Sequence, residues 1–292
     1  MPTIAVAHVR GNPLDKTAGD SLHPVLHPEL RADPAAALRH LRHAVRRLAA
    51  SSLDRPDEVH RARRVIRGLR LLLSLFREEV GERRRHRLDE ELRSLGFKFG
   101  RLRDWDVLRA RVLACGERQM IAEIDRRRRK ALRAIERRLD SRRFQRLDAG
   151  LKAATRRLRR RTDDQGRVEI DPLPMLDRRW QRFRQQLAAA HAGDAESLHA
   201  LRRQLRKLRQ SCRWLTEWLP RPVSATFMRT LQRAQDRLGL HHDFAIEQRL
   251  LAKLDQPWAL SSAARKVLDP RGIDRCLRQL AALASPVDTV AK

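Results

Sequence analysis

The sequence predicts an all-α protein built from two similar helical halves. Apolar residues recur every three or four positions from Ala35 onward, a spacing typical of amphipathic helices that bury one face. Signals for β-strands are absent, since there is no alternating apolar run and no Asn-Gly or Asp-Gly hairpin turn. The stretch 59–76 recurs without a gap at 198–215, 139 residues later. We therefore expect an internal duplication: two four-helix bundles related by a pseudo-twofold axis.

The first half is predicted over residues 35–161. It follows an N-terminal segment, residues 1–34, that we expect to be extended or disordered because prolines interrupt it and apolar periodicity is missing. Asp54 is a candidate N-cap for the helix that carries the repeated stretch. We expect that helix to run to about Glu79 and to end at Gly81.

The second half is predicted over residues 173–285, after a polar linker at 162–172 and before a short tail at 286–292. Residues 95–107 align with residues 234–246 at the same offset of 139 that relates the repeated stretches. A constant offset over some 70 residues indicates a duplicated unit rather than two unrelated amphipathic helices.

The repeated stretch carries histidine and arginine on one helical face and apolar residues on the other. Counted from the histidine, the charged positions fall at offsets of 3, 4, 7 and 10 residues, within a helical sector of about 120°. The first row consists of His60, Arg63, Arg64, Arg67 and Arg70. The second row, each member 139 residues later, consists of His199, Arg202, Arg203, Arg206 and Arg209. These rows are the strongest functional signal in the chain.

The charge of the chain indicates an anionic partner. The 292 residues include 65 lysines and arginines against 36 acidic residues, which gives a net charge of +29 and a pI near 11.6. Self-repulsion of this size opposes compaction, and nucleic acid, an acidic membrane or polymeric phosphate would relieve it. Only eight of these cations are lysines. Arginine binds phosphate oxygens in pairs through its planar fork, although a GC-rich genome would also favour arginine overall.

The sequence carries no pattern typical of an enzyme, a cofactor site or a membrane protein. Three scattered cysteines lack metal-ligand or disulfide spacing, and no apolar run approaches 18 residues, so we expect a cytoplasmic protein without a membrane partner. There is no phosphate-binding Gly-rich loop, no nucleophile elbow and no acidic cluster for a catalytic metal. We therefore expect a non-enzymatic binding protein.

Both repeats match H-x-x-R-R-x-x-R-x-x-R, and each is followed by a G-x-x-x-D segment, GRLRD in the first half and GLHHD in the second. Over about residues 35–285 the chain thereby resembles the CHAD domain, the conserved histidine α-helical domain. The resemblance implies two bundles with a basic pore or groove between them, binding of inorganic polyphosphate, and association with polyphosphate granules. Some members of this family also carry a triphosphatase domain; with 34 residues before the first expected helix, we expect none in this sequence.

Carried onto this sequence, the resemblance assigns ligand contacts to both rows and to Lys207. Weaker binding candidates are Arg39, Arg42, Arg46, Arg101, Arg178, Arg182 and Arg213. Asp104 and Asp243, the last residues of the two G-x-x-x-D segments, either orient an arginine or form ordinary surface ion pairs. The chain departs from internal symmetry where His241-His242 replace Leu102-Arg103, which predicts a different charge or contact there.

Two rival functions remain from the sequence. A basic helical protein can bind nucleic acid through backbone phosphates, although the absence of tyrosine and an aromatic content of 4% argue against base stacking. A metal site would need histidines at ligand spacing, for which the pairs His40/His43 and His241/His242 are the candidates. We interpret the basic run 126–130 as a solvated face or an outer electrostatic funnel.

Overall fold

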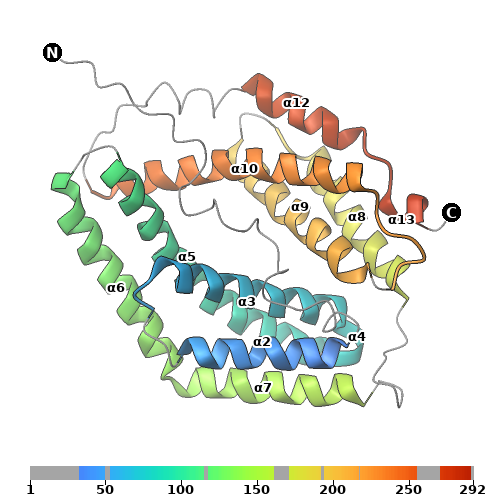
Figure 1. The fold of residues 1–292 in the computed structure, drawn as a ribbon, viewed down its shortest axis with the longest axis horizontal. Helices are drawn as coiled ribbons and strands as arrows, with labels where there is room; N and C mark the ends of the chain where they lie inside the picture. Colours follow the sequence, from blue (N-terminus) through green and yellow to red (C-terminus); the bar gives the residue numbers. More distant parts are fainter. Residues whose placement is uncertain are drawn as a thin grey trace. The chain divides into compact units, whose positions relative to one another are not determined.

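The computed structural model describes residues 33–49, 53–114, 118–160, 171–191, 194–216, 218–254 and 270–290. Every regular element in these residues is a helix, which confirms the predicted all-α class. The chain divides into two compact units, Met1–Val168 (unit 1) and Glu169–Lys292 (unit 2), whose helices are drawn in Figure 1. Most of the predicted N-terminal segment (1–32) and of the predicted linker (162–170), with the last two residues of the tail, lies outside the described residues.

In unit 1, α3 contacts both α2 and α5, α7 contacts α2 and α5, and α6 packs against α5 (Figure 1). The elements of the unit are α2 (Pro34–Ala49), α3 (Pro56–Leu75), α4 (Arg77–Val80), α5 (Glu82–Ala114), the 3-10 turn η1 (Arg118–Met120), α6 (Ile121–Leu139) and α7 (Arg142–Arg159). The apolar stripes predicted from the sequence are the surfaces that meet in this unit, and they supply its core.

The boundaries of α3 differ from those expected. Its N-cap is Arg55, whose side chain forms no capping hydrogen bond, so the prediction that Asp54 caps the helix is wrong. Pro56 at the first helical position supplies a preset φ instead. At the other end α3 stops at Leu75, and the single turn α4 follows before Gly81, whose φ of 87° is open to glycine and strained for other residues.

Two glycines on long helices allow close approach between helices of unit 1. A Cβ on Gly96 of α5 would lie 3.3 Å from Ile66 Cγ2 of α3. A Cβ on Gly150 of α7 would lie 2.8 Å from Leu88 Cδ2 of α5, too close for both atoms to keep their places. The missing side chains therefore set how closely α3 and α7 pack on α5.

Unit 2 repeats the order of the first three long helices of unit 1: α9 packs against α8 on one side and α10 on the other. Its elements are α8 (Pro172–Ala188), α9 (Ala195–Leu215), α10 (Ala225–Ala252), α12 (Pro270–Ala281) and α13 (Pro286–Val290). The predicted tail thus includes a helical turn, α13, which contacts α8. The duplication, the pseudo-twofold axis and the groove between the units stay predictions.

The helices α8, α9 and α10 of unit 2 begin at side-chain caps that the sequence supplies. Asp171 accepts a hydrogen bond from the backbone N–H of Leu173 at the start of α8, and Ser224 caps α10. At the start of α9, Asp194 accepts from the N–H groups of Glu196 and Ser197. These hydrogen bonds to the charged form lower the pKa of Asp194. The cap therefore determines where the helix of the second row begins.

Candidate functional site

The apolar faces of α3 and α9 are buried, as predicted, and this burial places the first four members of each row on the opposite face of the helix. The buried residues are Val59, Ala62, Ile66, Leu69 and Leu73 on α3, and Leu198, Leu201, Leu205, Leu208 and Cys212 on α9. All five members of the first row are half-buried. In the second row, His199, Arg202 and Arg206 are half-buried, while Arg203 and the neighbouring Lys207 are exposed.

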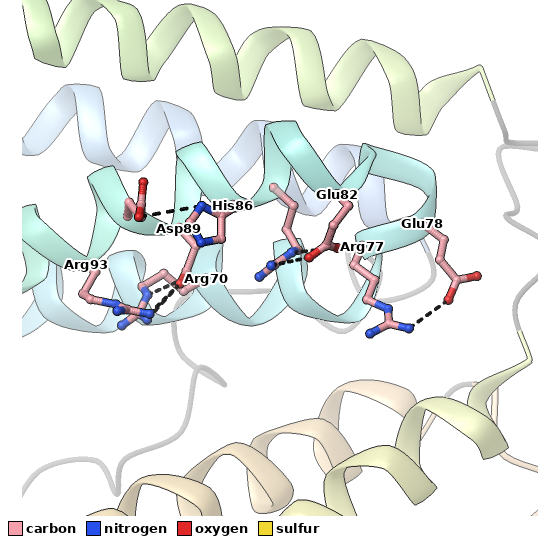
Figure 2. Close-up of polar contacts among 9 residues, drawn as sticks. Arg70, Arg77, Glu78, Glu82, His86, Asp89 and Arg93 are labelled. Atoms are coloured by element: carbon pink, nitrogen blue, oxygen red, sulfur yellow. Dashed lines mark hydrogen bonds and ion pairs between the residues drawn. The ribbon is translucent and has the colours of Figure 1, made fainter.

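Arg70, the last member of the first row, is held by a carboxylate. Its Nε donates to Asp89 Oδ1 of α5 at 2.7 Å, and its terminal nitrogen Nη2 donates to Asp89 Oδ2 at 3.3 Å, as Figure 2 shows. Arg93 donates to the same carboxylate at 3.4 Å. Burial raises the pKa of Asp89, but the hydrogen bond and the charges of the arginines outweigh it, so the pKa is lowered overall. Arg70 is therefore committed to an ion pair within unit 1.

Arg209, the corresponding member of the second row, lies in the interior. Its side chain is wholly buried, and its Nε donates to Gln235 Oε1 of α10 at 3.0 Å. This position differs from the expected contact with a ligand. A guanidinium enclosed between two packed helices acts on the site by holding α9 against α10.

His199, which heads the second row, pairs with His242 of α10. The two Nδ1 atoms lie 2.9 Å apart, and the rings are stacked with centroids 4.2 Å apart. Burial, followed by the charges of Arg203, Arg202, Arg206 and Arg249, lowers the pKa of His199 to about 4. Because this value is well below 7, the imidazole of His199 is neutral at neutral pH. The sequence indicated a departure at His241-His242, but it did not indicate this contact.

Gly239, which aligns with Gly100 in the G-x-x-x-D segments, lies beside an arginine of the second row. A Cβ on Gly239 would lie 3.7 Å from Nε and 3.8 Å from a terminal nitrogen of Arg202. The guanidinium of Arg202 therefore lies against the backbone of α10. In unit 1, no atom lies within 4 Å of a Cβ built on Gly100, so Arg63 makes no such approach.

Among the weaker candidates, Arg42 is the one that the structure places in a buried ion pair. It donates to both oxygens of Asp148 on α7, at 2.7 Å each, and its side chain is 10% exposed. Arg42 thus joins α2 to α7, and its weaker candidacy as a ligand contact stays a prediction. Arg39, Arg46, Arg101 and Arg182 are exposed, and Arg178 and Arg213 are half-buried.

Asp106 is a buried carboxylate on the apolar face of α5 that was not among the candidates from sequence. Its side chain is 1% exposed, and Oδ1 accepts from Arg128 Nε of α6 at 2.7 Å. Burial raises the pKa of Asp106, and the hydrogen bond and charge of Arg128 only partly offset it. Its spacing from Phe99 and Leu102, seven and four residues, was the signal, because it places a carboxylate on the apolar face. Asp104 and Asp243 are half-buried.

The basic run 126–130 is only partly a solvated face, which corrects the interpretation from sequence. Arg128 joins the buried carboxylate of Asp106 and also donates to the backbone carbonyl of Asp54, at 2.6 Å. Arg126 and Arg127 both pair with Glu123 and lower its pKa to about 2. Arg129 and Lys130 are exposed, as are Arg133 and Arg137 further along α6.

The candidate histidines do not assemble into a metal centre. Within the described ranges, no group of three or more histidine, cysteine or acidic side chains could hold a metal ion. Burial and the charges of three neighbouring arginines lower the pKa of His43, and burial lowers that of His241. Arginine charges of this kind also repel a metal cation, so they oppose metal binding at His43 and at His199.

The buried faces, the two rows and the histidine at the head of each row agree with one family. A model of the CHAD domain matches residues 32–252, which is most of the chain. The chain belongs to the CHAD domain family. The match ends with α10, whereas the resemblance in sequence was expected to extend to about residue 285; beyond α10 the two halves also stop matching one another.

Solved structures support the same assignment for this CHAD protein. It is similar to the crystal structure of the CHAD domain from the plant Ricinus communis, with 25% sequence identity and a TM-score of 0.63 over 89% of this chain and 91% of that one. PptA from Streptomyces chartreusis shares the fold, with 16% identity and a TM-score of 0.58 over 88% and 97% of the chains.

Two further comparisons returned nothing. No curated protein matches the sequence at a significant level. In the part of the chain that the structure describes, no helix combines the length and the apolar character needed to cross a membrane.

Proposed function

We propose that this CHAD protein binds inorganic polyphosphate without catalysing a reaction on it, through the first and second rows, and that binding targets it to polyphosphate granules. The observation that carries the proposal is the burial of the whole apolar face of α3 and of α9. Each helix is thereby held in place while a histidine and several arginines remain on its opposite face. The family resemblance, which implies polyphosphate binding, supports the same ligand.

The chemistry of the rows suits a polymer of phosphates. Polyphosphate is a flexible chain that repeats an anionic charge and offers no bases to read. Arginines spaced three, four and seven residues apart on a helix place successive guanidinium groups about 5–6 Å apart. Each can bind phosphate oxygens in pairs, and a packed helix loses little additional freedom on binding.

The contacts within each unit narrow the set of residues proposed to touch the ligand. Arg70 and Arg209 hold helices together, so we assign them a supporting role. The proposed contacts are His60, Arg63, Arg64, Arg67, His199, Arg202, Arg203, Arg206 and Lys207. For Asp104 and Asp243 both proposed roles stay open: orienting an arginine, or forming a surface ion pair.

Nucleic acid remains the alternative partner, and the aromatic residues disfavour it. Trp105, Trp180 and Trp214 are buried, and the ring of Trp218 stacks on that of Trp214. In the described ranges, the exposed aromatic side chain is Phe97, which is 67% exposed. Proteins that bind single-stranded nucleic acid usually stack its bases on several aromatic side chains. With one exposed ring in the described ranges, nucleic acid would have to bind mainly through its charge.

A competition experiment separates the two partners. Labelled long-chain polyphosphate bound to the full chain would be challenged with single-stranded DNA, duplex DNA and RNA at moderate salt, at equal phosphate concentration. We expect polyphosphate to remain bound. Displacement by any of the nucleic acids at equal phosphate concentration would refute the proposal in favour of the alternative.

A matched pair of variants tests the position of the site. Replacing Arg63, Arg67, Arg202 and Arg206 with glutamate should weaken polyphosphate binding by at least about 100-fold, since several phosphate contacts are lost. The control replaces four cations outside the rows with glutamate: Arg129, Lys130, Arg133 and Arg137, which are exposed on α6. This control should mainly reduce the salt dependence. Equal losses from both would show that only net charge matters.

A further inference from the structure

The geometry of the His199–His242 pair can accommodate one added proton. With the two Nδ1 atoms 2.9 Å apart, one ring donates its N–H and the other accepts it. A proton added to Nε2 of the donating ring makes that ring an imidazolium and leaves the Nδ1 hydrogen bond intact. A second proton would place two N–H donors against one another and break the contact. The geometry therefore favours uptake of a single proton.

The surroundings of His199 keep its imidazole neutral at neutral pH in the absence of a ligand. The four charged groups that act most strongly on His199 are arginines, and the largest single cause, burial, acts in the same direction. Arg202, Arg203 and Arg206 come from α9 itself, and Arg249 comes from α10. His241 and Asp243 flank His242 on α10, while α8 and α12, the other helices packed against this pair of helices, supply none of the four.

Unit 1 has a permanent charge at the corresponding position. At the offset of 139 that relates the rows, His242 corresponds to Arg103 of α5, which is buried, and His199 corresponds to His60. An arginine stays protonated over the whole physiological range of pH, whereas an imidazole does not. At this position unit 2 therefore has a group whose charge depends on pH, where unit 1 has a permanent charge.

We propose that the His199–His242 pair makes polyphosphate binding by unit 2 proton-coupled: the bound phosphates draw one proton onto the pair, and affinity rises as the pH falls. The inference rests on the proposed function. Phosphates lying against Arg202, Arg203 and Arg206 cancel the repulsion that keeps His199 neutral, and the new Nε2–H donates to a phosphate oxygen. By linkage, a group that gains a proton on binding raises affinity with falling pH, by at most about tenfold per pH unit for one proton.

The first test counts protons in the unmodified protein. Calorimetric titration with long-chain polyphosphate, whose titrating end groups are few, would be run at pH 5.5 in two buffers of different ionisation enthalpy. We expect net uptake of about one proton per chain and a dissociation constant about three- to tenfold lower at pH 5.5 than at pH 7.5. Binding without proton uptake would overturn the inference and leave the proposed function standing, while absence of binding at either pH would overturn both.

A reciprocal pair of variants locates the proton. His242→Arg gives unit 2 the residue that unit 1 carries, so it should abolish most of the pH dependence and raise affinity at pH 7.5. Arg103→His places a titratable residue in unit 1 and should steepen the pH dependence. His242→Gln, which keeps a polar side chain without a titrating group, should also flatten the profile and should lower affinity at pH 5.5. A pH profile unchanged in His242→Arg and His242→Gln would exclude the pair as the source.

Discussion

The last arginine of each row shows how one sequence pattern yields two environments. Arg70 is 32% exposed and pairs with the carboxylate of Asp89, whereas Arg209 is wholly buried and bonds to the amide of Gln235. At the offset of 139, Asp89 corresponds to Met228 and Gln235 corresponds to Gly96. The partner of Arg209 therefore lies seven positions further along the aligned helix than the partner of Arg70. A repeat preserves the face of a helix without preserving the partner of each side chain.

The largest effect that would test this comparison is expected at the buried member. Arg209→Ala should cost unit 2 about 4 kcal/mol, because it leaves a cavity and a buried amide without its donor. Arg70→Ala should cost unit 1 about 1 kcal/mol, since an ion pair that is still partly exposed to solvent contributes little. Hydrogen exchange of the amides in α9 and α3 reports on the two units separately. If the two variants lost hydrogen-exchange protection to a similar extent, Arg209 and Arg70 would contribute equally to stability, contrary to this prediction.

The buried carboxylate of α5 offers a second contrast, because its counterpart in α10 is Ala245. Arg128→Met should destabilise unit 1 by about 3 kcal/mol at pH 8, since it leaves the Asp106 charge buried and unpaired. The pKa of Asp106 is already raised by burial, and loss of Arg128 raises it further. The cost is therefore present above that pKa and shrinks as the pH falls through it, because protonated Asp106 needs no cation.

Urea unfolding of this variant at pH 8 and pH 5 measures the effect, which should be smaller at pH 5. The double variant Asp106→Asn with Arg128→Met is the control, and it should recover part of the stability at pH 8. A cost that is independent of pH would mean that Arg128 contributes by packing rather than by charge.

A smaller loss of stability is expected at Arg42 of α2 than at Arg128, and almost none at the corresponding position of α8. Arg42→Met should cost unit 1 about 2 kcal/mol by leaving Asp148 without its partner, and it should change polyphosphate affinity less than twofold. Gln181, the counterpart in α8, is exposed, so Gln181→Met should change stability by less than about 0.5 kcal/mol. Thermal unfolding together with a binding titration gives both numbers. A clear loss of affinity in Arg42→Met would instead place Arg42 in the binding site.

The smallest effect concerns the ion pair of the first row. Asp89→Asn should lower the stability of unit 1 by less than about 1 kcal/mol at pH 7. Because the pKa of Asp89 is lowered in the folded protein, its contribution is present above the usual carboxyl pKa and is lost as the pH falls below about 4. The difference between the variant and the parent in urea unfolding should therefore shrink progressively as the pH is lowered from about 5 to about 2. Polyphosphate affinity should rise slightly, since one negative charge beside the first row is removed.

Much of the fold could be read from apolar periodicity. The buried faces of α3 and α9 were predicted residue by residue, since a spacing of 3.6 residues is a local property of the chain. The end of α3 could not be predicted from the sequence, because the helix stops at Phe76 although the apolar pattern continues beyond it. The prediction that Asp54 caps α3 was wrong for a similar reason. Asp54 is a residue type that often caps helices, but the helix begins one residue later, with Pro56 at its first position.

The sequence by itself determined the all-α class, the family, the buried faces and the two rows, because these depend on residue types at short, regular spacing. Tertiary structure decided which cations remain on the surface and which are held inside. Arg42 meets a carboxylate 106 residues away, Arg128 one 22 residues away, and His199 meets His242 at a separation of 43. Such partners are brought together only when helices pack, so no local pattern predicts them.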